Sequence, residues 1–246
     1  MHVKLVSLTQ PQVYGYDDKL MDAEGIIAYC ARVSNPKNQH NVATAPKLLK
    51  FLIKHKHWSP FELANMCVEI KTSRAIAAQI LRHRSFSFQE FSQRYSEATE
   101  MEPVELRAPA EKNRQSSSKI IEDEAINTMV EMMMDANKQL YEQMIAGGVA
   151  KECARMILPL GTQTTMYMNG TVRSWIHYIN LRTEENTQKE HRDIANAVKN
   201  IFIKQFPNVS EALDWKAHEW SEEELEKMQW DEFQSYHKKP DESTHE

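Results

Sequence analysis

Residues 82–95 constrain this chain more than any other part of its sequence. The segment holds three arginines, one histidine, one glutamate and three serines, interleaved with Phe86, Phe88 and Phe91. A guanidinium group is always charged at neutral pH and offers five donors in a rigid fork, which suits phosphate. Because three such charges repel one another, we expect the fold to gather them around a bound anion. A solvated turn is the alternative, and the three aromatic side chains argue against it.

The composition limits how such an anion can be held. The chain has 246 residues, enough for one domain, and only six glycines, with no glycine-rich loop of the phosphate-binding kind. If it binds nucleotides, arginine side chains must do so. Three widely spaced cysteines favour a reducing compartment, and we expect a cytoplasmic protein. No apolar run is long enough for a bilayer and the N-terminus lacks a signal-peptide pattern, so we expect no membrane partner.

The net charge of −5 is unevenly distributed. Residues 216–246 carry ten acidic against four basic side chains, whereas residues 1–215 are nearly neutral. We therefore expect one domain over residues 1–215, followed by an acidic, marginally ordered tail over residues 216–246. A neutral body with clustered arginines predicts local anion sites and no broad nucleic-acid surface.

Apolar periodicity and capping residues predict an α/β (α+β) domain with helices packed around a mostly antiparallel sheet. Ser73 and Thr171 are natural N-caps, Gly147 and Gly148 end a long methionine-rich helix, and Gly170 suggests a turn. The predicted strands cover 3–8, 63–71 and 164–168. The predicted helices cover 17–32, 42–56, 74–82, 122–145, a shorter stretch to about 157, 171–180 and 187–205. Residues 96–120 read as a long polar loop of the kind that serves as a lid or binding loop.

A second set of cationic residues lies downstream. Arg173 and His177 are four residues apart and share a helix face, whereas Arg182 lies about half a turn away from Arg173. The helix must therefore end or bend near Asn180 if all three serve one site. Arg155 and Arg182 stand in apolar surroundings, where arginine is seldom buried without a partner. Surface arginines on a helical bundle are the alternative.

Other chemistry has weaker support in the sequence. His55 and His57 form a His-x-His pair without a third ligand at characteristic spacing, so we expect no metal. Ser92 has no nucleophile motif around it, and hydrogen bonding to phosphate suits it better. A module that binds single-stranded nucleic acid through residues 82–95 and a metal hydrolase remain as alternative functions.

Several blocks in order resemble the flavin-dependent thymidylate synthases. The first is Arg82-His83-Arg84, then seven residues, then Ser92 with Gln93-Arg94-Tyr95 after it. The others are residues 31–34, 57–62, Gln79, 154–159, and Arg173 with His177 and 180–182, so the resemblance covers roughly residues 28 to 205.

The resemblance implies an activity and its partners. Members convert dUMP to dTMP with FAD, with methylenetetrahydrofolate as carbon donor and NADPH as reductant, and without an enzyme nucleophile on the pyrimidine. The assembly implied is a homotetramer whose active sites are shared between subunits. A guanidinium that cannot lose its proton suits stabilisation of negative charge on the uracil edge, so Arg182 is the predicted catalytic residue.

Matching positions also imply the binding residues. The FAD site would comprise Ser34, Ser59, Arg82, His83, Arg84, Glu90, Thr171, Arg173 and His177. The dUMP site would comprise Gln79, Arg82, Glu90, Ser92, Gln93, Arg94, Arg155 and Arg182, with the phosphate at residues 92–94. The chain departs from the family at two places: Thr171 and His177 replace Asn of some members, and residues 186–191 keep only Gln188 and Glu190 of a family motif.

Overall fold

A four-stranded antiparallel sheet forms the centre of the computed structural model, which describes residues 1–97, 100–113 and 116–222. Its strands lie in the order β1 (His2–Leu8), β2 (Asn65–Ser73), β6 (Gln163–Thr171) and β3 (Phe86–Glu90). In β2 the side chains of Met66, Val68 and Ile70 are buried, and alternate residues point to the other face. This alternation fixes the register, in which Val68 and Phe88 both pair with Met168 of β6.

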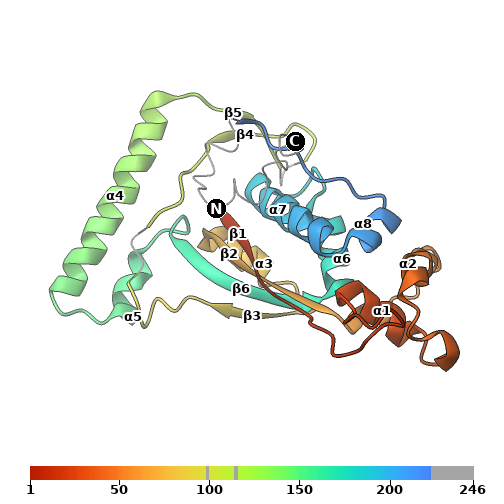
Figure 1. Cartoon of the computed structure of the whole chain (residues 1–246). Helices are drawn as coiled ribbons and strands as arrows, with labels where there is room; N and C mark the ends of the chain where they lie inside the picture. Colours follow the sequence, from red (N-terminus) through yellow and green to blue (C-terminus); the bar gives the residue numbers. More distant parts are fainter. Residues whose placement is uncertain (98–99, 114–115, 223–246) are drawn as a thin grey trace, which may run out of the picture.

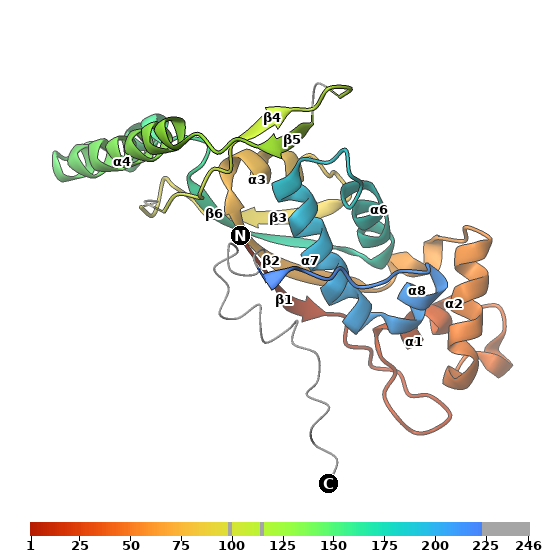
Figure 2. The ribbon, with the colours of Figure 1, turned by 90° about the horizontal axis from the view of Figure 1, so that it is seen from above.

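Helices cover one face of this sheet (Figure 1). The three that lie on it are α3 (Arg74–Ile80), α6 (Val172–Arg182) and α7 (Lys189–Gln205). Figure 2 shows α7 passing over the strands. Trp175 and Tyr178 of α6 and Phe202 of α7 are fully buried, and they join the apolar residues of β2 and β6 in one core. The opposite face of the sheet carries half-buried or exposed side chains, among them Glu69 and Tyr167.

Smaller helices extend this layer at one end of the sheet. They are α1 (Ala23–Ala31), α2 (Ala45–Lys54) and α8 (Pro207–Ala212), and α2 packs against both of the others. Asp22 caps α1, so the predicted helix over 17–32 begins six residues later than expected. The sequence did not predict α8, which follows α7 directly through Phe206 and Pro207.

A long helix and a short hairpin stand away from the sheet (Figures 1 and 2). The hairpin pairs β4 (Arg107–Pro109) with β5 (Ser117–Ile120), within the segment predicted to be a loop. Helix α4 (Glu124–Ala146) follows, capped by Asp123 and closed by Gly147 and Gly148, the latter at φ +82°. Tyr141 is the fully buried residue of α4, and a short helix α5 (Lys151–Ala154) leads back to the sheet.

Three local predictions need correction. Residues 86–90 form strand β3, which the sequence analysis did not identify. Gly170 lies within β6 and not in a turn, and a Cβ atom there would come within 2.4 Å of the Phe86 ring. Glycine therefore permits the ring to pack across the strand. Finally, α6 does not end near Asn180 but continues to Arg182.

Part of the acidic tail lies on the folded domain. The Asn200 side chain donates to the carbonyl of His218 and accepts from its backbone N–H, each at 2.8 Å. Trp220 packs against the core, so residues 216–222 follow α7. Residues 223–246 lie outside the described residues, and the division at residue 215 stays a prediction. Within the ranges that the structure describes, no helix combines the length and apolarity needed to cross a membrane.

Candidate functional site

The predicted nucleotide-binding residues gather at the two ends of β3. His83 precedes the strand and Ser92 follows it. The first group, which we call the Arg182 cluster, comprises Gln79, His83, Tyr178, Arg182 and His191. The second group, which we call the Arg94 cluster, comprises Ser92, Gln93, Arg94, Lys151 and Glu152. A strand of this length separates its two ends by about 13 Å, so the two clusters lie at opposite ends of β3.

Local sequence explains how the Arg182 cluster forms. The Ser73 hydroxyl accepts from the N–H of Ile76 and starts α3, as predicted. The chain turns where the backbone N–H of His83 donates to the carbonyl of Ile80, which directs the imidazole into the protein. There the ring is 9% exposed and lies edge-on to Tyr178, with centroids 4.9 Å apart.

Arg182 reaches this buried ring from the end of α6. Its Nε donates to Nε2 of His83 at 2.9 Å. Its terminal nitrogens make no hydrogen bond or ion pair with any residue that the structure describes. The guanidinium of Arg182 is therefore fixed through Nε while its two outer amino groups stay available to a ligand. This is the arrangement needed to bind an anionic edge.

Gln79 lies beside Arg182 and is fixed from two sides. Its Nε2 donates to the side chain of Gln188 at 2.7 Å, and its Oε1 lies 3.3 Å from Nδ1 of His191. His191 is fully buried and belongs to the first turn of α7. The sequence analysis missed His191 because it stands between Glu190 and Arg192, in a stretch that reads as exposed.

Burial keeps the two imidazoles neutral. Burial, together with the nearby charges of Arg182 and His177, lowers the pKa of His83 to about 4. Burial, together with Arg182 and His83, lowers the pKa of His191 to about 3. Burial raises the pKa of Tyr178 well above its usual value. At neutral pH the positive charge of the Arg182 cluster is therefore carried by the guanidinium.

The Arg94 cluster surrounds an exposed hollow of about 360 Å³, which is lined by Ser92, Arg94, Tyr95 and residues 150–152. Arg94 pairs with Glu152 at 3.2 Å, and Lys151 donates to the carbonyl of Tyr95 at 3.3 Å. Gln93 is next to Arg94 in the chain and is buried, and its Nε2 has no hydrogen-bond partner among the described residues. Arg155 is half-buried at the end of α5 without an ion pair among the described residues.

The residues predicted to contact a flavin lie mostly at the surface. Ser34, Ser59, Arg82, Arg84 and His177 are exposed, and the guanidinium groups of Arg82 and Arg84 have no partner among the described residues. Unpaired guanidiniums of this kind fit the pyrophosphate of a dinucleotide.

The other predicted flavin residues have partners within the protein. Arg173 forms an ion pair with Glu62, and Thr171 caps α6 by accepting from the N–H of Ser174. Glu90 accepts from Arg74 at 3.3 Å and from Thr164 at 2.9 Å. Glu62 and Arg74 had no predicted role. Arg74 could have been noticed, because a cation in the first turn of a helix opposes the helix dipole and needs a counter-charge.

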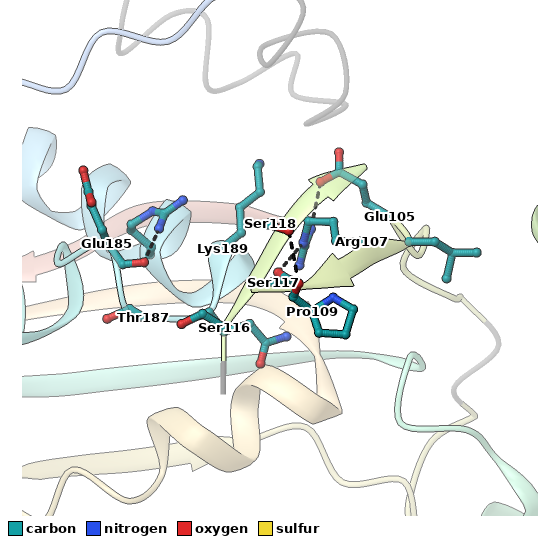
Figure 3. Close-up of a pocket in the computed structure, with 12 residues that line it drawn as sticks. Glu105, Arg107, Pro109, Ser116, Ser117, Ser118, Glu185, Thr187 and Lys189 are labelled. Carbon is teal, nitrogen blue, oxygen red and sulfur yellow. Dashed lines mark hydrogen bonds and ion pairs between the residues drawn. The ribbon is translucent and has the colours of Figure 1, made fainter. Parts of the chain in front are cut away.

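A second hollow of about 430 Å³ lies between the β4–β5 hairpin and the start of α7 (Figure 3). At its floor Arg107 pairs with Glu105 at 2.8 Å and with Glu190 at 2.5 Å. Gln188 lines this hollow and also bonds Gln79, so the hollow adjoins the Arg182 cluster. Nowhere in the described part of the chain, this hollow included, do three potential metal ligands lie close together.

Comparison with known proteins identifies the family. A family model described as "Thymidylate synthase complementing protein" matches residues 18–208. The chain is 54% identical over 219 residues to the "Probable flavin-dependent thymidylate synthase" of Paramecium bursaria Chlorella virus 1, covering 87% of this chain and 100% of that protein. It belongs to the flavin-dependent thymidylate synthase family.

Other members and a solved structure agree. The family's "Flavin-dependent thymidylate synthase" from Synechocystis is 53% identical over 218 residues, covering 87% of this chain and 100% of its own length. The crystal structure of "a UMP/dUMP methylase PolB" from Streptomyces cacaoi bound with 5-Br dUMP superposes with a TM-score of 0.70 at 22% identity, covering 87% of this chain and 94% of that one. The sequence-based family and fold predictions are confirmed.

Proposed function

We propose that this chain is an FAD-dependent enzyme that methylates dUMP to dTMP, with methylenetetrahydrofolate as carbon donor and NADPH as reductant. The main support from this chain's own residues is the geometry of Arg182. Arg182 is held at Nε by a buried neutral imidazole, and its outer amino groups have no partner among the residues that the structure describes. A fixed, permanently charged fork of this kind suits the oxygen and nitrogen edge of a uracil.

The two clusters divide the recognition of dUMP between them. The uracil edge meets Gln79 and Arg182 of the Arg182 cluster, with Arg82 next to His83 in the chain. Glu90, also assigned to dUMP, lies at the other end of β3, close to the Arg94 cluster in the chain. The phosphate meets the Arg94 cluster, where Ser92, Gln93 and Arg94 are joined by Arg155. The buried, unpartnered Nε2 of Gln93 supports this, since it can still donate a hydrogen bond.

The flavin site comprises Ser34, Ser59, Arg82, His83, Arg84, Glu90, Thr171, Arg173 and His177. When bound, FAD supplies hydride chemistry, and the protein supplies binding and orientation. The exposed guanidiniums of Arg82 and Arg84 would hold its pyrophosphate. The Thr171 hydroxyl already caps α6, so its contribution is to set the direction of that helix.

Arg182 acts by stabilising charge, without a nucleophile from the protein. Negative charge on the uracil edge makes C5 more reactive, and preorganised donors aimed at that edge contribute on the order of 10²–10³ in turnover. Ser92 does not compete as a nucleophile, because no base among the described residues bonds its hydroxyl.

A homotetramer would join the two clusters. Because β3 separates the two clusters within one chain, the Arg94 cluster of one subunit would bind the phosphate of a dUMP whose uracil lies at the Arg182 cluster of another subunit. The exposed face of α4 supports self-association: Ile126, Met129, Met133 and Leu140 recur along one side of the helix and are 45–65% exposed. Met133→Glu should reduce the mass measured by light scattering, whereas Glu142→Gln, away from this stripe, should not.

The partners proposed are the small molecules named above, and the location proposed is cytoplasmic. Three free cysteines, Cys30, Cys67 and Cys153, support a reducing compartment.

An absorbance spectrum of the purified protein tests the function directly. With FAD added, the protein should retain the yellow chromophore through gel filtration, and dUMP should shift its spectrum. Conversion of dUMP to dTMP with the folate and NADPH completes the test. A folded protein that takes up no flavin and forms no dTMP would contradict the proposal.

A further inference from the structure

Two buried imidazoles lie directly behind the side chains that the proposed function assigns to the uracil. The His83 and His191 rings are perpendicular, with centroids 6.2 Å apart. They come from α3's end and from α7, and Tyr178 of α6 packs against both. Both rings are withdrawn from solvent, at 9% and 0% exposed.

The bond to Arg182 fixes the tautomer of His83. A guanidinium has donors and no acceptor, so His83 Nε2 must be unprotonated to accept from Nε of Arg182. The neutral ring therefore carries its proton on Nδ1. The same bond uses the inner nitrogen of Arg182 and directs the fork outward.

The bond to Gln79 fixes His191 in the same way. The amide of Gln79 donates its Nε2 to Gln188, which leaves Oε1 as the acceptor facing His191 Nδ1. His191 thus also carries its proton on Nδ1. Its Nε2 is buried and has no hydrogen-bond partner among the described residues, as is true of the hydroxyl of Tyr178.

We propose that His83 and His191 are positioning residues: His83 aims the guanidinium of Arg182, and His191 aims the amide of Gln79, at the uracil. The inference rests on the proposed function, because it supplies the uracil. Neither histidine need touch the reacting atoms for this role. His83 was predicted from the family as a flavin contact, and its bond to Arg182 gives it a second task.

Electrostatics favours this arrangement over a charged one. A protonated His83 would lose its acceptor and place a positive charge against the guanidinium. The lowered pKa values, about 4 for His83 and about 3 for His191, keep both rings neutral at physiological pH. Arg182 can then approach to hydrogen-bond distance without repulsion.

The test for His83 compares two replacements in the full-length enzyme loaded with FAD. His83→Gln keeps an acceptor oxygen, whereas His83→Leu has none. We expect His83→Leu to lower kcat about 100-fold, the scale of loss for a misplaced catalytic group. His83→Gln should stay within about fivefold of the wild type. Because His83 also belongs to the proposed flavin site, FAD content is measured by absorbance and kcat is expressed per bound flavin. The dUMP affinity, measured by titration calorimetry, should change less than kcat in both variants.

A double-mutant cycle separates positioning from general structure. In the Arg182→Ala background, His83→Leu should cause no further loss of kcat, because there is no guanidinium left to aim. Additive losses, or equal losses for His83→Gln and His83→Leu, would overturn the role of His83. If the Leu variant does not fold, full activity of Arg182→Ala would still overturn it.

His191 is tested through dUMP affinity. His191→Leu should raise the dUMP Kd about fivefold, the value of one neutral hydrogen bond, and His191→Gln should restore it. Tyr178→Phe should raise the dUMP Kd less than His191→Leu does. Tyr141→Phe removes an equally buried hydroxyl and is the control, which should leave the dUMP Kd unchanged. An unchanged Kd in His191→Leu would overturn this part. Wild-type protein that forms no dTMP would instead refute the proposed function, which separates the two failures.

Discussion

The clusters at the two ends of β3 contain similar residues but differ in burial and in charge pairing. In the Arg182 cluster, His83, Tyr178 and His191 are buried behind the half-buried Gln79 and Arg182. The cluster is neutral apart from one guanidinium and is built from three helices that the core holds in place. The Arg94 cluster is exposed, and its arginine pairs with Glu152, which a ligand phosphate would have to replace. Buried groups are fixed by packing and by hydrogen bonds that water cannot replace, whereas exposed ion pairs are weak and exchangeable.

This difference suggests a division of labour. Chemistry needs donors that are already aimed when charge develops, and burial provides that aim. Capture of a phosphate needs charge and access, and an exposed hollow provides both. The comparison therefore predicts that changes in the Arg182 cluster affect turnover and that changes in the Arg94 cluster affect binding.

The largest effect should come from Arg182→Ala. Loss of the aimed guanidinium should lower kcat by about 10²–10³, while the dUMP Kd changes less, because the phosphate contacts remain. Steady-state kinetics with calorimetry measures both. Arg192→Ala is the control, since the Arg192 guanidinium donates to the backbone carbonyl of Glu185 and to neither member of the uracil pair, Gln79 or Arg182. Unchanged turnover in Arg182→Ala would remove the catalytic role and the comparison with it.

Arg94→Ala should act at the other end. Removing a charge-assisted bond to phosphate costs about 1.5–3 kcal/mol, so the dUMP Kd should rise roughly 10- to 100-fold with little change in kcat at saturating dUMP. Lys47→Ala, an exposed cation on α2, serves as the control. A fall in kcat with unchanged Kd would contradict the division of labour.

The pH dependence of stability should also distinguish the two ends. The folded-state pKa of His83, about 4, lies below the ordinary value of 6.5, and that of His191, about 3, lies lower still. The unfolded chain therefore binds protons that the folded chain does not. The contribution of the two neutral histidines to the free energy of unfolding is complete above pH 6.5. It falls as the pH drops toward 4, by about 1.4 kcal/mol per pH unit for each histidine.

Urea unfolding between pH 5 and pH 7 measures this slope. His83→Gln should flatten it, because one titrating group is gone. Arg94→Ala should leave it as in the wild type, because no imidazole depends on that side chain. A slope that His83→Gln does not alter would show that the imidazole is not protected from protonation.

The smallest effect should come from Glu152→Gln. Glu152 competes with phosphate for Arg94, and an exposed pair of this kind is worth about 0–1 kcal/mol. Its loss should tighten dUMP binding up to about fivefold and should leave the thermal stability unchanged. Weaker binding would mean that Glu152 orients Arg94 for the ligand and does not compete with it.

Local chemistry made part of the fold predictable. Ser73 and Thr171 were correctly predicted as caps, because a hydroxyl before a helical pattern satisfies a free N–H wherever it occurs. Strand β2 was predictable from its alternating apolar residues. Strand β3 was missed although Phe86 and Phe88 alternate with polar residues, because the run is only five residues long and its existence depends on pairing with β6. The turn predicted at Gly170 was wrong for the same reason, because the glycine is needed to make room for the Phe86 ring of the neighbouring strand.

The residues assigned to the candidate site came from the sequence and stay a prediction, whereas their geometry came from the structure. The sequence by itself determined the family, through the spacing of Arg82, His83, Arg84 and Ser92, because spacing along the chain can be read without knowing the fold. Only the tertiary structure decided that His83, 99 residues from Arg182, lies directly behind it, and that His191 lies behind Gln79. Burial and neighbouring charge set an imidazole's pKa, and both depend on which distant helices pack around it.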